Sequence, residues 1–368
     1  MPTLTKHQLL DLIDDVPQLP LASLPTPLEN CPNLSHVLGG PPIWIKRDDC
    51  TGLATGGNKT RYLEFVLADA KKKGADTIVV SSGNQSNQCR QVAAAAAKLG
   101  LESVLLLWGA EPEALEGNLL LSNVLGAQIV FLDLPVPNTG QETVLEPQFA
   151  LEAPPGDRSL LNDAIDTQLT RLRKEGRVPY CINTDPRPGL AALGYVKAAV
   201  ELIEQLDRQG IPEADVFVAS GGATHAGLLL GSLLLSERIQ VHGVYYQGHS
   251  VDSRAQRIAG IAEDAARLLN LDLQVDPSKV DSDPTFATRT LFDNSVSRWQ
   301  TVLDVARTEG ILIEPSYTGR ALMAVERFIA QGRYSVDRPI VLVHTGGTPL
   351  LFPLGRQLIA VASRRMGA

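Results

Sequence analysis

Short hydrophobic strands alternate with amphipathic helices along much of this chain, and this alternation is the feature that most limits its fold. Strand-like segments occupy 77–81, 103–108 and 128–132, and the segments 87–99 and 117–125 between them have helical patterns that end at a glycine. Strands joined by helices of this length pair in parallel, with helices on both faces of the sheet. We therefore expect an α/β protein with open, mostly parallel twisted sheets, whose ligands bind beyond the carboxyl ends of the strands.

The alternation continues after a proline-rich, acidic segment at 133–157, which is expected to be a surface loop. The elements predicted in this second part are helices at 159–174 and 191–206 and strands at 180–183, 215–220, 240–246 and 340–345. Residues 1–42 are punctuated by prolines, and 24–30 read as an extended segment. Mixed helix and loop are expected between the last two strands.

Composition and charge limit the classes of partner. The formal net charge of −8 argues against nucleic acid and anionic membrane, because neither is attracted to an acidic surface. The sequence has no apolar run of transmembrane length and no signal-peptide core at its start, so a cytoplasmic location is expected. The four cysteines lack CxxC spacing and suit a reducing compartment, and the six histidines are scattered, so no metal site is expected.

The stretch 43–61 places a single lysine, Lys59, after a glycine-rich loop and at the start of a helix. The pair Gly56–Gly57 indicates that something approaches the backbone closely. The first interpretation is a cofactor bonded to Lys59. The alternative is a nucleotide-binding P-loop, but the spacing differs from G-x4-G-K-[ST] by one inserted residue.

The residues just before this loop have ordinary structural explanations. Asp48 and Asp49 point to opposite faces of an extended chain, which argues against a shared metal, and one of them is expected to brace Arg47 or Lys46. Cys50 is expected to be structural, since no histidine lies near it in sequence.

Three further polar turns follow predicted strands. The turn 220–224 (SGGAT) opens a helix and predicts either a phosphate site or a tight turn with nothing bound. Ser86 either caps its helix or belongs to a carboxylate site at that helix N-terminus. The third turn, 344–349, ends a buried strand. Tyr317 lies in another polar turn, 314–321, and is either an acid/base group or a packing side chain.

Taken together, these motifs resemble a known family. GGNKTR, the QSN turn with RQVAAAAAKLG, EGNLLL, LGYV, SGGATHAGL, EPSYTG and HTGG occur in the order found in the D-cysteine desulfhydrase and 1-aminocyclopropane-1-carboxylate (ACC) deaminase family. Members are pyridoxal-phosphate enzymes of the tryptophan-synthase-β fold type, fold type II. The resemblance runs from about residue 24 to residue 354.

The resemblance implies a role for each motif residue. Lys59 would hold pyridoxal 5'-phosphate as a Schiff base, and Tyr317 would sit beside the ring. Ser86, Asn87, Gln88 and Thr318 would bind the substrate. Lys59, Ser86 and Tyr317 would be the catalytic residues. Asn87 would meet the ring hydroxyl, and Thr345 would face the pyridine nitrogen. The phosphate would be cradled by Ser220, Gly221, Gly222, Ala223 and Thr224. Asn58, Lys59 and Tyr317 complete the implied cofactor-binding residues.

The implied reaction is β-elimination from a small amino acid, D-cysteine or another β-substituted alanine, to pyruvate and ammonia. Thr318 and Thr345 are the desulfhydrase-like residues at the two late loops and disfavour the cyclopropane deaminase. An L-cysteate sulfo-lyase is another alternative, as is a binding protein without turnover. Three features depart from the family: Asn84, Gln88 and the loop 183–189. Arg187 in that loop is either a reader of an acidic substrate group or a surface residue.

The resemblance also implies the organisation of the protein. A large cofactor-binding domain is expected from 1–60 together with 176–368, and a small domain from 61–175, with the cofactor between them. A homodimer is expected, acting on a small amino-acid substrate.

Overall fold

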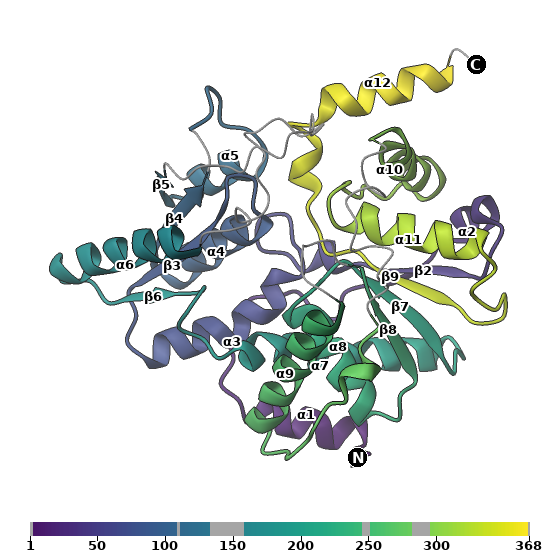
Figure 1. The fold of residues 1–368 in the computed structure, drawn as a ribbon, viewed down its shortest axis with the longest axis horizontal. Coiled ribbons are helices and arrows are strands. Elements are labelled where there is room, and N and C mark those ends of the chain that lie inside the picture. Colours follow the sequence, from purple (N-terminus) through teal and green to yellow (C-terminus); the bar gives the residue numbers. More distant parts are fainter. Residues whose placement is uncertain (1–2, 109–110, 133–157, 245–250, 282–294, 367–368) are drawn as a thin grey trace. The chain divides into compact units, whose positions relative to one another are not determined.

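The computed structural model describes residues 3–108, 111–132, 158–244, 251–281 and 295–366, and its fold is drawn in Figure 1. The chain divides into two compact units. Unit 1 comprises Met1–Phe65, Arg187–Thr348 and Arg356–Ala368, and unit 2 comprises Val66–Pro186 and Pro349–Gly355. The segment 66–175 is common to unit 2 and to the expected small domain.

The sheet of unit 1 has five strands in the order β1-β2-β9-β7-β8. Their bounds are Leu28–Asn30 (β1), Ile43–Lys46 (β2), Ala214–Val218 (β7), Ile239–Gly243 (β8) and Ile340–Val343 (β9). Only the β1–β2 pair in this sheet is antiparallel, and Ile45 pairs with Leu342 in the parallel β2–β9 ladder. Because β2, β9 and β7 are neighbours and parallel, the loops after them meet at one edge of the sheet.

The helices of unit 1 include α1 (Lys6–Asp14), α2 (Pro32–Leu38), α7 (Pro188–Arg208), α8 (Ala223–Leu234), α9 (Val251–Leu268), α10 (Ser295–Glu309), α11 (Thr318–Ala330) and α12 (Gly355–Met366). Short 3₁₀ turns lie at Asp48–Cys50 (η1) and Pro277–Lys279 (η3), and a third, Thr348–Leu351 (η6), lies where the chain passes from unit 1 into unit 2. Helices α7 and α8 pack so closely that a Cβ on Gly227 would lie only 2.3 Å from the carbonyl oxygen of Ala192. This packing fixes the N-terminus of α8 at the sheet edge described above.

The sheet of unit 2 is entirely parallel, in the order β5-β4-β3-β6. Its strands are Thr77–Gly83 (β3), Glu102–Trp108 (β4), Gln128–Leu132 (β5) and Pro179–Cys181 (β6), and its helices are α3 (Lys59–Lys72), which begins in unit 1, α4 (Asn87–Leu99), α5 (Gly117–Val124) and α6 (Arg158–Lys174). Val79, Leu106 and Leu169 belong to the buried cluster between this sheet and α6. The predicted fold class, with mostly parallel sheets flanked by helices, is confirmed.

Two parts of the chain differ from the expected secondary structure. The N-terminal segment contains α1, which begins with a capping box between Thr5 and Gln8, and α2, in addition to the extended residues of β1. The strand expected over 240–246 ends at Gly243, and its last two residues lie outside the described part of the chain, as does the loop expected at 133–157.

Candidate active site

Asn58 connects the three loops at the carboxyl edge of the unit 1 sheet. It ends the loop after β2, its backbone N–H donates to Thr345 O at 3.1 Å in the loop after β9, and its side-chain Nδ2 donates to Thr224 Oγ1 at 3.0 Å, just after β7. Asn58 is 5% exposed, so both bonds are shielded from water. The residue directly before Lys59 is therefore fixed from two sides.

Lys59 is the first residue of α3, and its surroundings differ from those of an ordinary lysine. Its side chain is partly buried and forms no hydrogen bond or ion pair with any residue in the described part of the chain. Burial without a compensating carboxylate lowers the pKa of its ammonium to about 8. Lys46 provides the contrast: it is buried too, but it pairs with Glu201 and donates to Gln205 Oε1 at 2.8 Å. Of these two lysines, Lys59 is the one without a carboxylate partner among the described residues.

The glycine loop before Lys59 is held at its base by the backbone. Gly57 N donates to Asp48 O at 3.0 Å and to Thr51 Oγ1 at 2.8 Å. Gly56 has φ +66°, and a Cβ there would lie 1.8 Å from Asp49 O. A Cβ on Gly346 would lie 2.7 Å from Gly57 Cα. The glycines thus permit a close approach by the protein's own backbone.

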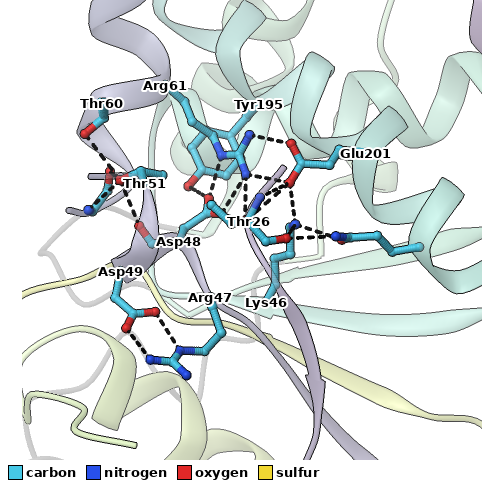
Figure 2. A network of polar contacts seen from close by, with 12 residues as sticks. Thr26, Lys46, Arg47, Asp48, Asp49, Thr51, Thr60, Arg61, Tyr195 and Glu201 are labelled. Atoms are coloured by element: carbon cyan, nitrogen blue, oxygen red, sulfur yellow. Dashed lines mark hydrogen bonds and ion pairs between the residues drawn. The ribbon is translucent and has the colours of Figure 1, made fainter. Parts of the chain in front are cut away.

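A buried ion network anchors the first turn of α3 (Figure 2). Arg61 Nε donates to Asp48 Oδ2 at 2.9 Å and Nη2 donates to Asp48 Oδ1 at 2.8 Å, and both Nη1 and Nη2 donate to Glu201 at 3.0 Å. Tyr195 OH donates to Asp48 Oδ2 at 2.5 Å. Burial opposes ionisation of Asp48, but the Arg61 guanidinium outweighs it and holds the pKa of Asp48 at about 2. The network lies two residues from Lys59 and keeps the helix start in place.

Asp49 braces Arg47, at 2.9 Å to Nε and 2.7 Å to Nη2, as predicted for one of the two aspartates. Lys46 pairs with Glu201. Cys50 is an exposed residue. Partial desolvation of its thiol, together with the Asp49 carboxylate, raises the pKa of the thiol, which does not favour a thiolate nucleophile.

The SGGAT turn forms the N-terminus of α8. Ala226 N donates to Gly222 O at 3.0 Å, so the N–H groups of residues 223–225 precede the first helical hydrogen bond. A Cβ on Gly222 would meet no atom within 4 Å, and Gly222 is only partly buried. Free amides and the positive end of the helix dipole together attract an anion such as a phosphate.

The late loops contain a chain of hydrogen bonds that ends at Thr345. Thr318 Oγ1 lies 3.2 Å from His344 Nδ1, and Thr345 N donates to Thr318 Oγ1 at 3.3 Å. Before them, the buried carboxylate of Glu314 accepts from the N–H groups of residues 316–318 at the start of α11. Burial raises the pKa of Glu314 to about 7, against the effect of these bonds. Tyr317 is partly buried at the N-cap of α11.

In unit 2, the residues of the QSN turn begin α4. Ser86 Oγ accepts from Gln88 N at 3.1 Å and from Cys89 N at 3.3 Å, so the capping interpretation holds. Asn87 is buried, and Gln88 is partly buried. Asn118 was missed by the reasoning from single residues, although it lies in the EGNLLL motif. Its side chain contacts Asn87 Oδ1 at 2.8 Å.

Within the described part of the chain, Arg187 forms no bond to the loops described above. It forms an ion pair with Asp264, and 54% of its side chain is exposed. Asp264 also accepts from Gly189 N at 2.9 Å, so the pair fastens the beginning of α7. This geometry supports the surface interpretation of Arg187.

Comparison with known proteins decides the family. Residues 19–346 match the family of pyridoxal-phosphate dependent enzymes. The chain belongs to that family. It is 38% identical to the D-cysteine desulfhydrase of Klebsiella pneumoniae over 91% of this chain and 95% of the relative, and 37% identical to the D-cysteine desulfhydrase of Salmonella typhi over the same shares. A solved structure of an ACC deaminase homologue matches with a TM-score of 0.78 and 29% identity, covering 96% of this chain and 99% of the other. The family resemblance and the expected fold type are confirmed.

The cofactor is therefore pyridoxal phosphate, and the residues fit it. The group needs an amine that loses its proton more easily than an ordinary lysine does, and N–H donors for its phosphate. Lys59 supplies the first, with its ammonium pKa at about 8. The amides that begin α8 supply the second. Among the described residues, no helix is long and apolar enough to cross a membrane, and no cluster of His, Cys, Asp and Glu is arranged to hold a metal ion.

Proposed function

We propose that this protein is a lyase that uses pyridoxal phosphate for β-elimination on a small amino acid, with D-cysteine as the substrate, giving pyruvate, ammonia and sulfide. The proposal is carried by the environment of Lys59. This lysine has no carboxylate partner in the described part of the chain, and the residue before it, Asn58, is hydrogen-bonded to the SGGAT and HTGG loops. The names of the relatives support D-cysteine as the substrate.

In this mechanism Lys59 is the base. When bound, the pyridoxal ring withdraws the electron pair left on the substrate Cα. A neutral Lys59 Nζ accepts the α-proton, and the lowered pKa of Lys59 makes the neutral amine accessible near pH 8. Thr345, whose backbone N–H donates to Thr318 Oγ1, would present a neutral hydroxyl to the ring nitrogen, which suits elimination because less charge has to be delocalised than in transamination.

The other roles follow the resemblance. The phosphate is proposed to bind at the amides of Ser220, Gly221, Gly222, Ala223 and Thr224, and Tyr317 to lie beside the ring. Ser86 and Gln88, at the start of α4, are proposed to bind the substrate carboxylate, with Thr318 as a further substrate-binding residue. The Ser86 hydroxyl accepts two backbone N–H groups, so its own proton stays available to donate to a carboxylate.

The test is a panel of substrates read for each enantiomer. Purified protein with pyridoxal phosphate is given D- and L-cysteine, other β-substituted alanines, L-cysteate and ACC, and pyruvate, sulfide, sulfite and ammonia are measured. D-cysteine is expected to give pyruvate and sulfide at the highest kcat/KM. Lys59→Ala is expected to lose both the visible absorbance band and the activity, whereas Lys73→Ala, just after the C-terminal end of α3 and 53% exposed, should keep both. A Lys59→Ala protein that keeps the band after dialysis would refute the assignment.

A second candidate is ACC deamination. It is favoured by the similarity to the solved structure of an ACC deaminase homologue at 29% identity. Thr318 and Thr345 are the residues that argue against it, and turnover of ACC in the panel without turnover of D-cysteine would establish it. Cysteate has no such support, since Arg187 is occupied by Asp264.

We further propose that the protein is a cytoplasmic homodimer, with unit 1 as the cofactor-binding domain. The resemblance is the support for this assembly. Sedimentation at several protein concentrations tests it, and a single species at the mass of one 39.5 kDa chain would contradict it.

A further inference from the structure

Asn118 is the centre of a buried hydrogen-bond network in unit 2. Its backbone N donates to Gln85 Oε1 at 3.0 Å. Its side-chain Nδ2 donates to the Gln85 backbone O at 2.9 Å and to Asn87 Oδ1 at 2.8 Å. Its Oδ1 accepts from Arg90 Nε at 2.8 Å. Asn118 and Arg90 are both 0% exposed, so these bonds do not compete with water.

Two partners of the Asn118 side chain leave no choice in how its amide is oriented. The nitrogen and oxygen of an asparagine amide are told apart by their partners. Arg90 Nε is a donor only, so the atom facing it is Oδ1. The Gln85 backbone O is an acceptor only, so the atom facing it is Nδ2. The orientation of Asn118 is thus set by a guanidinium and a carbonyl group, neither of which can change its role.

The orientation of Asn118 determines that of Asn87. The second hydrogen on Asn118 Nδ2 points to the Asn87 side chain, so the Asn87 atom at 2.8 Å must be an acceptor, its Oδ1. The nitrogen Nδ2 of Asn87 is left as the outward group, and it has no hydrogen-bond partner in the described part of the chain. Asn87 is the first residue of α4 and is 9% exposed. It therefore presents an N–H donor beside a helix N-terminus, where an anion is favoured.

We propose that Asn118, oriented by Arg90, is a positioning residue that holds the Asn87 amide with its nitrogen outward, so that Asn87 recognises an anionic oxygen of the bound ligand. The inference rests on the proposed function, and the oxygen is the one that the family resemblance assigns to Asn87, the ring hydroxyl of pyridoxal phosphate in its deprotonated form. Asn118 touches no reacting atom; it acts through Asn87. The order of control runs from Arg90 to Asn118 to Asn87.

Asn118→Asp tests this order with a side chain of the same shape. A carboxylate has no N–H, so Asn87 is expected to turn its nitrogen toward Asp and its oxygen toward the ligand. The dissociation constant for pyridoxal phosphate should rise about tenfold or more, the effect of losing one charge-assisted hydrogen bond. The midpoint pH of the visible band should move upward, because the anionic oxygen loses its donor. Asn123→Asp, at an exposed position on the same helix, should change neither.

A double-mutant cycle separates positioning from a general structural effect. In the Asn87→Ala background, Asn118→Asp should leave the dissociation constant and the band midpoint unchanged, because Asn118 acts only through Asn87. An equal loss in both backgrounds, or no loss in the wild-type background, would overturn the proposal.

A measurement without ligand keeps the inference independent of the proposed function. In protein labelled with ¹⁵N-asparagine, the Asn118 side-chain amide should exchange slowly with solvent and the Asn87 amide quickly; each signal is assigned by its loss in the corresponding Asp variant. Slow exchange at Asn87 and fast exchange at Asn118 would refute the orientation. Failure of the proposed function would appear elsewhere, as a wild-type protein that releases no pyruvate from any amino acid.

Discussion

The side-chain nitrogen of Asn58 donates a hydrogen bond to Thr224 Oγ1 at 3.0 Å, across 166 residues of sequence. The same residue donates its backbone N–H to Thr345 O at 3.1 Å. One asparagine therefore connects the start of α3 with the N-terminus of α8 and with the loop after β9. Because Lys59 follows Asn58 directly, a neutral, buried bond holds the start of Lys59's helix to the SGGAT turn.

Asn58→Ala is expected to loosen the attachment of Lys59. Removing the amide leaves the buried Thr224 hydroxyl without this donor, which costs about 1–3 kcal/mol of the free energy of unfolding. The dissociation constant for pyridoxal phosphate should rise about tenfold. Asn33→Ala is the matched control, since exposed Asn33 donates one bond to Thr308 O at 3.1 Å. Equal effects of the two variants on cofactor binding would contradict the connecting role of Asn58.

Gly56→Ala should be far more disruptive than Gly39→Ala. Both glycines have positive φ, +66° and +63°, so alanine is strained at each by about 1 kcal/mol. At Gly39 an added Cβ meets nothing within 4 Å, whereas at Gly56 it would lie 1.8 Å from Asp49 O. Gly56→Ala must therefore displace the loop before Lys59. Denaturant unfolding and cofactor titration of both variants check this, and similar losses would show that the loop yields easily.

Arg61→Met should break the buried network of Figure 2. It leaves Asp48, at 0% side-chain exposure, without its guanidinium partner, and removing one member of a buried pair costs about 3–5 kcal/mol. Lys73→Met, just after the C-terminal end of the same helix, removes an exposed pair with Asp69 and should cost less than about 1 kcal/mol. Urea unfolding compares the two. Should Arg61→Met cost no more than Lys73→Met, the network would not anchor the helix.

Local pattern was sufficient for the elements that carry their own start and stop signals. Helix α4 has the predicted bounds 87–99, because Ser86 caps its first turn and Gly100 takes a left-handed φ of +69° at its end. Helix α1 carries the same kind of signal, a capping box from Thr5 to Gln8. It was not predicted, because the prolines that follow it in sequence favour extended structure.

Long-range side-chain pairing could not be predicted from the sequence. Arg61 and Glu201 are 140 residues apart, and no periodicity of either segment indicates that they meet. Asn118 is 31 residues from Asn87, and the motif around it gave no role. The glycine pair before Lys59 predicted that some group approaches the backbone closely. That the Asp49 carbonyl oxygen lies beside Gly56 depends on the folded turn and could not be predicted. Partner identity is set by tertiary packing.

Lys59 should react with pyridoxal phosphate at a lower pH than an ordinary lysine. With a pKa of about 8, about a tenth of its amine is neutral at pH 7, compared with less than about 0.1% for an unperturbed lysine. Borohydride trapping followed by peptide mass analysis should give a labelling rate at Lys59 that rises from pH 6 to 8 and then levels, while a free lysine peptide in the same tube continues to rise. Lys59→Arg should abolish the label.

The same lowered pKa makes Lys59 a cost to the cofactor-free protein at neutral pH. The folded pKa of about 8 lies below the ordinary value of 10.5, so the unfolded chain binds more protons between these values and stability rises with pH across that window. Lys59→Met removes the charge that has to be buried, and the cofactor-free variant should be more stable than the wild type at pH 7. The difference should shrink as the pH approaches 10, and urea midpoints at both pH values measure it. A variant that is less stable than the wild type at pH 7 would show that the Lys59 charge is compensated in the folded protein.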